Sequence, residues 1–319
     1  MTPPTPAHRA VAGRPGPLPL PGPLVGADWL APRLGTPGLV LLDASVGAHR
    51  GTDRRIPGAR PFDLDGPLSD HGAPAPHTMP GAAAFTEALR DLGVRDTDTL
   101  VVYDAAGLYS SARAWWMLRA MGFDRAAVLD GGLPAWTAAD RPVEAAAPAY
   151  TGPRGSFTAH PRPGLFGDGT GVAAALADPA AAVLDARTRE RFAGTAPEPR
   201  PGLRGGHMPG AVNLPFGELQ GPDGLMRAVP ELRAAFAQAA GERQRLWFSC
   251  GSGVTACVLA LGAHLAGYRD LTVYDGSWSE WGLPSARPVA TGDGTGPSDP
   301  ADAGPGTGPT GPAAARPGT

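Results

Sequence analysis

The chain repeats a series of short motifs, and this internal repeat limits its possible folds more than any other feature. In the first half the series is LVLLD ending at Asp43, IPGA starting at Ile56, LVVYD ending at Asp104 and LDGGLPAW ending at Trp136. The second half contains a matching series in the same order: AAVLDAR, MPGA, LWFSC and YDGSWSEW. Loop lengths differ between the halves, but the order of the motifs does not. The sequence therefore predicts a duplicated domain.

Each copy alternates short apolar runs with segments of helical periodicity. Runs such as LVLLD, LVVYD, AAVLD and LWFS are almost continuously apolar, which is typical of buried parallel strands. Apolar residues recur with the period of a helix in four segments: 81–92, 111–121, 230–240 and 255–267. We therefore expect an α/β fold of two tandem domains, each a parallel sheet flanked by helices.

The limits of these domains follow from local composition. The 319 residues include 46 Gly and 38 Pro, which are concentrated near the two ends of the chain. We expect disordered tails at 1–24 and 291–319, because these segments carry too few large apolar side chains to offset the entropy of ordering. The Pro- and Ala-rich stretch 142–160 is interpreted as a linker between an inactive copy at 25–141 and a catalytic copy at 161–290.

Composition also excludes several classes of function. All 27 basic residues are arginine, so a Schiff-base lysine and a P-loop lysine are both excluded. The net charge of −3 predicts no binding to nucleic acid. No apolar run is long enough to span a membrane, and the proline-broken N-terminus lacks the apolar core of a signal peptide, so we expect a cytoplasmic protein without membrane partners. Two cysteines without neighbouring ligands, and His71 and His77 in a Pro-rich loop, predict no metal site.

Cys250 stands at the junction of a predicted strand and a predicted helix. The strand LWFS precedes it, Gly-Ser-Gly-Val-Thr follows it, and the helix starts near Thr255. Gly251 and Gly253 allow the backbone to curl so that successive N–H groups surround the sulfur. Such a ring of amides at a helix N-terminus favours a thiolate or a persulfide anion. The pattern predicts a nucleophilic cysteine with an accessible sulfur, and a buried structural cysteine is the alternative.

Neighbouring residues narrow the chemistry. Cys257 lies between Ala256 and Val258 and is interpreted as a small core residue. Asp104 stands where the first copy should have its cysteine, and a carboxylate cannot act as a sulfur nucleophile. The first copy is therefore expected to be inactive and to form a wall of the site. Phosphatases with a cysteine loop carry an arginine six residues after the cysteine, and Ala256 at that position argues against phosphotransfer.

Three motifs resemble the tandem rhodanese-type sulfurtransferases: CGSGVTAC, DGSWSEW and GHMPGAVNLPF. The resemblance covers roughly residues 24–290, and within the family the neutral loop is similar to that of members that use 3-mercaptopyruvate. It implies that Cys250 attacks the sulfur of this small-molecule donor, releases pyruvate and carries a persulfide. A thiol acceptor such as thioredoxin, or cyanide, then takes the outer sulfur, and no cofactor is implied.

The resemblance also implies roles for single residues. Arg191 and Arg200, in RERFAGTAPEPR, match the arginines that bind the donor carboxylate, and bidentate pairing suits that role. Arg113 matches a first-copy arginine that faces the cleft in relatives. Ser252 would protonate the leaving enolate or carry a proton relay. The remaining substrate-binding positions are those of the loop: Gly251, Gly253, Val254 and Thr255.

One position departs from the family pattern. Members often read His-Ile-Pro-Gly-Ala in the first copy, and that histidine forms a relay with the loop serine, whereas this chain has Arg55 before Ile56. Either water replaces the relay or Arg55 contributes only charge. His207 is interpreted as a turn residue bonded to nearby backbone, and Thr255 as a cap of the following helix. Two tryptophans in the middle of a predicted helix, Trp115 and Trp116, are interpreted as core.

Two other functions stay open. A thiosulfate:cyanide sulfurtransferase would use the same cysteine with a different donor. A persulfide carrier would hand sulfur to a partner protein with little turnover of its own.

Overall fold

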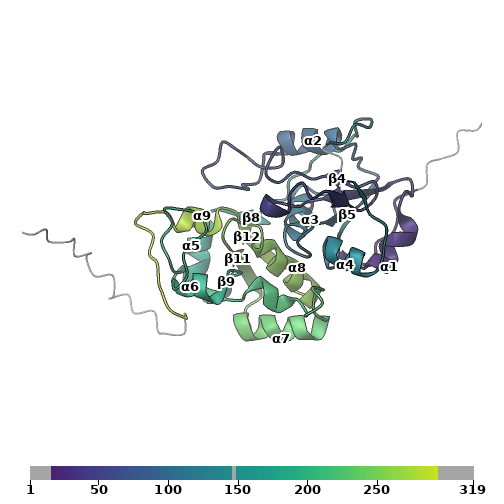
Figure 1. The fold of residues 1–319 in the computed structure, drawn as a ribbon. Coiled ribbons are helices and arrows are strands. Elements are labelled where there is room, and N and C mark those ends of the chain that lie inside the picture. Colours follow the sequence, from purple (N-terminus) through teal and green to yellow (C-terminus); the bar gives the residue numbers. More distant parts are fainter. Residues whose placement is uncertain (1–15, 146–148, 294–319) are drawn as a thin grey trace, which may run out of the picture.

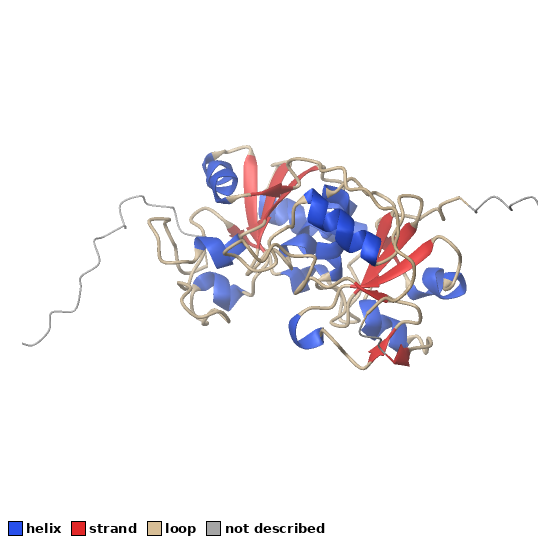
Figure 2. Ribbon diagram, turned by 90° about the horizontal axis from the view of Figure 1, so that it is seen from above, coloured by secondary structure: helices blue, strands red, loops and turns tan. Residues whose placement is uncertain are grey.

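The computed structural model describes residues 16–145 and 149–293. Two α/β domains lie side by side, the first in purple and blue and the second in green and yellow (Figure 1). In each domain the apolar runs are strands of one parallel sheet, as their almost continuous hydrophobicity predicts. Seen from above, two groups of strands are separated by helices that lie between them (Figure 2).

The first domain contains a five-stranded sheet in the order β1-β6-β5-β2-β4, in which all neighbours are parallel. Its strands are β1 (Leu24–Val25), β2 (Leu39–Asp43), β4 (Arg60–Pro61), β5 (Thr99–Tyr103) and β6 (Ala126–Leu129). Two further short strands, β3 (Arg54–Arg55) and β7 (Glu144–Ala145), pair antiparallel. The α-helices are α1 (Ala27–Leu30), α2 (Ala82–Asp91), α3 (Ser111–Ala120) and α4 (Gly132–Ala138). Two short 3₁₀ helices span Ala31–Arg33 and Gly47–His49.

The second domain repeats this arrangement. Its parallel sheet has the order β10-β9-β11-β12-β8, which is the first sheet's order when matching strands are compared. The strands are β8 (Phe166–Gly167), β9 (Ala181–Asp185), β10 (Val212–Asn213), β11 (Arg245–Ser249) and β12 (Asp270–Tyr274). The α-helices are α5 (Gly169–Ala177), α6 (Arg189–Ala193), α7 (Val229–Ala240), α8 (Ala256–Ala266) and α9 (Ser277–Trp281), and a 3₁₀ helix spans Phe216–Leu219. The predicted fold class is confirmed.

Helices α3 and α8 join the two domains through one continuous apolar core. Trp115 and Trp116 are each 1% exposed, which confirms their interpretation as core residues. The Trp115 ring lies 5.6 Å from the ring of His264 on α8, and Trp116 Nε1 donates to the carbonyl of Leu165 at 2.9 Å. Apolar packing across the boundary therefore fixes the two domains against each other.

The N-terminal tail is shorter than predicted. Leu24 belongs to β1, and Thr99 Oγ1 donates to the carbonyl of Leu18 at 2.8 Å, so the expectation of disorder up to residue 24 is wrong for this part. The physical reason is that β6 has an edge whose backbone groups need a partner, which β1 supplies. Residues 1–15 and 294–319 of the two expected tails lie outside the described residues.

The described part of the stretch 142–160 lies along the first domain. Glu144–Ala145 form β7, which pairs with β3, and Gly155 N donates to the carbonyl of Arg90 at 2.7 Å. Phe157 is fully buried, with its ring 5.8 Å from that of Phe85. This connection is anchored by packing, and the exact limits of the domains stay a prediction. Among the helices described, none combines the length and the hydrophobicity that a membrane crossing requires.

Phe157 gives a stability test of that anchoring. We expect Phe157→Ala to lower the free energy of unfolding by about 3–5 kcal/mol, because it removes a buried aromatic ring from the core of the first domain. The measurement is urea denaturation of the full chain. Ser156→Ala, which changes an exposed neighbouring side chain, is the matched control and should have almost no effect. A loss below 1 kcal/mol for Phe157→Ala would show that the connection is not part of the core.

Candidate active site

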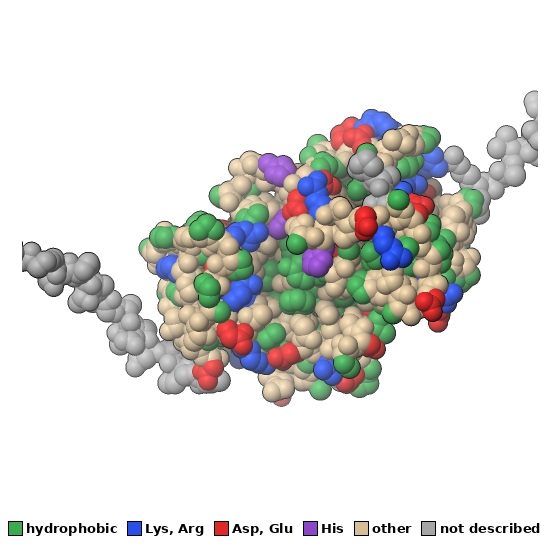
Figure 3. Space-filling model, in the orientation of Figure 1, with side chains coloured by type: hydrophobic (Ala, Val, Ile, Leu, Met, Phe, Trp, Pro, Cys, Tyr) green, Lys and Arg blue, Asp and Glu red, His purple; other side chains and the backbone are tan. Residues whose placement is uncertain are grey.

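Cys250 directly follows β11 at the carboxyl edge of the second sheet, and α8 begins six residues later at Ala256. Ligands of parallel α/β sheets bind at this edge. Cys250 is only 1% exposed, but Gly251 beside it is half-buried and marks where the loop reaches the surface. The expectation of an accessible sulfur is therefore wrong, because protein covers the Cys250 side chain. On the face shown in Figure 3, histidine side chains lie close together along the boundary between the two domains.

The two loop glycines are needed for different reasons. Gly253 has a φ of +73°, and a Cβ there would lie 2.7 Å from the carbonyl of Asp275. Gly251 does not require a left-handed backbone, but a Cβ on it would lie 3.0 Å from Nη2 of Arg191. One glycine permits the turn, and the other permits an arginine to lie directly over the loop.

Residues at the start of α9 hold the loop from behind. The N–H of Trp278 donates to the carbonyl of Cys250 at 3.0 Å, and the N–H of Ser279 donates to the carbonyl of Gly251 at 2.9 Å. The N–H of Cys250 donates to Ser277 Oγ at 3.1 Å. Because C=O and N–H point in opposite directions in a trans peptide, the carbonyls bound to α9 turn the amides of Gly251 and Ser252 towards the other side of the loop. This arrangement is suited to surround an anion.

The first domain contains a direct analogue of this loop. Asp104, at the position of Cys250, is fully buried and its carboxylate accepts N–H bonds from Ala106 at 3.0 Å, Tyr109 at 3.0 Å and Ser111 at 2.8 Å. The same kind of loop in the same chain thus gathers three amides around a negative charge. In the first copy the loop amides bind the Asp104 carboxylate, and because a carboxylate stands where the second copy has its cysteine, this loop has no sulfur nucleophile.

His77 links the cysteine loop to Asp65 through a chain of hydrogen bonds. Ser252 Oγ lies 3.1 Å from His77 Nδ1, and His77 Nε2 lies 2.9 Å from Asp65 Oδ1. Since a carboxylate only accepts, Nε2 of neutral His77 carries the proton and Nδ1 accepts from the serine hydroxyl. Burial lowers the pKa of His77 below its usual 6.5, and the charges of Arg113 and Arg200 act in the same direction against the opposing effect of Asp65. His77 is therefore neutral at pH 7.

Sequence reasoning missed both His77 and Asp65. It looked for the relay at position 55, but Arg55 instead pairs with Glu144 at 2.7 Å, between β3 and β7. The one available signal was the length of the segment between β4 and α2, since long segments without regular structure are often functional. No periodicity connects His77 with Ser252, which comes from the other domain.

The two predicted carboxylate-binding arginines lie beside the loop. Arg191 pairs with Glu198 at 2.6 Å and faces Gly251, while Arg200 Nη1 donates to Ser279 Oγ at 3.2 Å. Burial raises the pKa of Tyr109 from the first domain, the charge of Cys250 raises it further, and Arg191 and Arg200 oppose this. These charged groups are thus near enough to interact.

Arg113 does not face an open cleft, so its prediction as a substrate contact is corrected. It is fully buried and pairs with Asp275 at 2.7 Å. Its guanidinium also donates to the carbonyl of Gly253 at 3.3 Å and to the carbonyl of His77. A buried arginine needs such partners, and these place it behind the loop as a support.

Two further loop residues can be compared with their predicted roles. The Val254 side chain is 3% exposed and packs into the domain, so a contact of this residue with the substrate stays a prediction. Thr255 precedes α8 but makes no side-chain cap bond, so the prediction of a cap is wrong. Its φ of −74° and ψ of −17° are already helical, whereas a capping hydroxyl needs an extended residue to reach the N–H groups of the first turn.

Two structural interpretations are confirmed. Cys257 is fully buried, its Sγ donates to the carbonyl of Gly253 at 3.3 Å, and burial raises its pKa to about 12. His207 is a turn residue whose Nδ1 lies 2.8 Å from the carbonyl of Phe192, with the two rings stacked 3.8 Å apart. Cys257 is therefore unsuited to act as the nucleophile.

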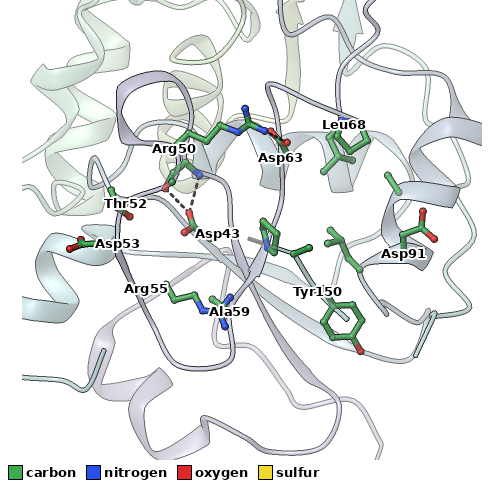
Figure 4. A pocket seen from close by; sticks show the side chains of 17 residues that line it. Asp43, Arg50, Thr52, Asp53, Arg55, Ala59, Asp63, Leu68, Asp91 and Tyr150 are labelled. Atoms are coloured by element: carbon green, nitrogen blue, oxygen red, sulfur yellow. Dashed lines mark hydrogen bonds and ion pairs between the residues drawn. The ribbon is translucent and has the colours of Figure 1, made fainter. Parts of the chain in front are cut away.

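A separate cavity of about 630 Å³ lies in the first domain (Figure 4). It is lined by residues from the end of β2, the 50–55 segment, α2 and Tyr150. Its arginines are already paired, Arg50 with Asp63 and Arg55 with Glu144. Because none of its lining residues carries a thiol, this cavity is not the site of sulfur chemistry.

Comparison with known proteins agrees with this geometry. The sequence model of the rhodanese-like domain matches residues 26–139 and 170–283. The 3-mercaptopyruvate sulfurtransferase of Escherichia coli K12 is 40% identical over 275 residues, covering 83% of this chain and 96% of the relative. The human 3-mercaptopyruvate sulfurtransferase is 40% identical over 285 residues, covering 83% and 93%. Bovine thiosulfate sulfurtransferase is 36% identical over 273 residues, covering 81% and 91%.

Solved structures show the same relationship. The crystal structure of SseA, a 3-mercaptopyruvate sulfotransferase from Escherichia coli, superposes with a TM-score of 0.71 at 37% identity and covers 81% of this chain and all of that one. Tum1 protein from Saccharomyces cerevisiae gives a TM-score of 0.77 at 27% identity, covering 85% and 98%. With two matched domains, a shared sheet order and relatives similar over most of its length, the chain belongs to the rhodanese family as a tandem-domain sulfurtransferase.

Proposed function

We propose that this protein transfers sulfur from 3-mercaptopyruvate, through a persulfide on Cys250, to a thiol acceptor. The observation that carries the proposal is the Asp65–His77–Ser252 chain of hydrogen bonds at the cysteine loop. Transfer from 3-mercaptopyruvate moves a proton as well as a sulfur atom, whereas transfer from thiosulfate moves no proton. A neutral base beside the nucleophile therefore suits the first donor.

The reaction balances without a cofactor. The Cys250 thiolate forms a bond to the donor sulfur while the donor's C–S bond breaks, and the electron pair of that bond goes to the methylene carbon. That carbon takes up the proton given up by the donor thiol, which yields pyruvate and a Cys250 persulfide anion. The acceptor thiolate then attacks the outer sulfur, which restores the Cys250 thiolate.

The surrounding residues each support one part of this reaction. Loop amides stabilise the thiolate and the persulfide, as the amides around Asp104 stabilise its carboxylate. Ser252 and His77 take the proton of the donor thiol and return it to carbon. Arg191 and Arg200 bind the donor carboxylate.

A reduced thioredoxin is the acceptor we propose, since it offers a low-pKa thiol that can enter thiol–disulfide exchange. A reducing compartment such as the cytoplasm suits a reaction that needs a free cysteine. Thiosulfate is the second candidate donor, because the same amides and arginines can hold its anionic groups and bovine thiosulfate sulfurtransferase is 36% identical.

Cys250 provides the direct test of the nucleophile. We expect Cys250→Ser to abolish pyruvate release and Cys257→Ser to keep most of it, because the second thiol is fully buried and its pKa is raised to about 12. Intact mass after incubation with 3-mercaptopyruvate should show one added sulfur on the peptide bearing Cys250. Loss of activity from Cys257→Ser alone would mean that the nucleophile is misassigned.

Ser252 separates the two donors. We expect Ser252→Ala to lower kcat with 3-mercaptopyruvate by about 10²- to 10⁴-fold, the usual contribution of general acid–base catalysis. With thiosulfate and cyanide the same variant should keep nearly all its activity, because no proton moves in that transfer. Equal losses with the two donors would contradict the relay and favour a purely structural role for the hydroxyl.

The pH dependence tests His77. Its lowered pKa keeps the base neutral at pH 7, so kcat with 3-mercaptopyruvate should fall only as the pH drops through a value below 6.5. A protonated His77 can no longer accept a proton from Ser252. The thiosulfate reaction should not show this fall of kcat at low pH. The His77→Gln variant should have a lower kcat with 3-mercaptopyruvate, and that kcat should no longer fall at low pH. An identical fall with both donors would instead assign it to the nucleophile.

A further inference from the structure

Ser279, on α9, links one of the two arginines to the cysteine loop. Its Oγ donates to the carbonyl of Gly251 at 2.6 Å, and Arg200 Nη1 donates to the same Oγ at 3.2 Å. The carbonyl can only accept, so the hydroxyl proton is committed to Gly251 and a lone pair is left for the guanidinium. With the side chain 7% exposed, few other orientations of the hydroxyl are available.

Arg200 depends on this contact more than its neighbour does. Arg191 is held by Glu198, whose two carboxylate oxygens accept from its Nε and Nη2 at 3.2 and 2.6 Å. For Arg200, by contrast, no carboxylate of residues 16–145 and 149–293 lies within ion-pair distance. Among the described residues its charge is thus not paired with a carboxylate. Burial is the main cause of the lowered pKa of His77 and of the raised pKa of Tyr109, and the Arg200 charge adds to the first shift and opposes the second.

We propose that Ser279 is a positioning residue that fixes Arg200 relative to Cys250 and thereby sets the preference for an α-keto carboxylate donor. The proposal rests on the function proposed above. Gly251 is the residue next to the nucleophile. Ser279 connects its carbonyl to the Arg200 guanidinium, so the guanidinium is held at a fixed distance from the Cys250 sulfur. A carboxylate held by Arg200 then places the donor's own sulfur at a set distance from Cys250.

The serine can be changed without releasing the loop. Removing Oγ deletes the contact with Arg200, but the N–H of Ser279 still donates to the carbonyl of Gly251 at 2.9 Å. The N–H of Trp278 likewise still donates to the carbonyl of Cys250 at 3.0 Å. Ser279→Ala should therefore leave the cysteine loop in place and affect mainly the arginine.

We expect Ser279→Ala to raise KM for 3-mercaptopyruvate about five- to tenfold, the usual effect of losing one intramolecular hydrogen bond, while kcat changes less than twofold. Ser279→Thr keeps the hydroxyl and should restore KM. Ser285→Ala is the matched control, because Ser285 Oγ accepts from Arg204 Nη2 at 3.5 Å on an exposed segment away from Cys250. Arg200→Ala sets the upper limit of the effect.

Pyruvate binding separates this proposal from the donor assignment. Pyruvate carries the carboxylate without the sulfur, so its Kd, measured by calorimetry on the full chain, reports on Arg200 even if the protein does not turn over 3-mercaptopyruvate. Weaker pyruvate binding in Ser279→Ala and Arg200→Ala, with wild-type binding in Ser279→Thr and Ser285→Ala, supports the proposal. Unchanged pyruvate binding in Ser279→Ala, or an equal fall of kcat with both donors, overturns it.

Discussion

The buried ion pair between Arg113 and Asp275 is the contact on which the site depends. It joins the first domain to the second, with 2.7 Å between the two groups and the arginine fully buried. Removing such a cation from water is costly, so it must be offset by several partners. The carbonyls of Gly253 and His77 and the ring of Phe166, 4.4 Å away, supply them. The Arg113 guanidinium therefore fixes the position of His77 relative to the cysteine loop.

Duplication explains why the site needs both domains. Each copy forms a loop at the carboxyl end of its central strand, but Asp104 fills the first loop with its own carboxylate. The first copy instead contributes residues that reach across the boundary, namely His77 at the loop and Arg113 behind it. The continuous core between α3 and α8 keeps these groups at hydrogen-bond distance. Rigid packing of the boundary is thus a requirement of the chemistry.

The sequence predicted those parts of the structure that depend on interactions between residues close together in the chain. Continuous apolar runs predicted the strands, and Gly-Ser-Gly between a strand and a helix predicted the loop around Cys250. The bond between His77 and Ser252 joins residues far apart in the chain and in different domains, and no sequence period records it. Arg113 was misplaced for the same reason, since its burial depends on Asp275. Thr255 had the right side chain for a cap, but its backbone dihedral angles do not allow one.

The charges around the loop also connect donor binding with proton transfer. Arg191 pairs with Glu198, which Arg187 shares, and Arg113 pairs with Asp275, whereas Arg200 bonds to a hydroxyl and to no carboxylate of the described residues. Burial is the main cause of the lowered pKa of His77, and the charges of Arg113 and Arg200 add to it against the opposing effect of Asp65. If Arg200 binds the donor carboxylate as proposed, that carboxylate offsets part of the Arg200 charge, and the proton affinity of His77 then rises.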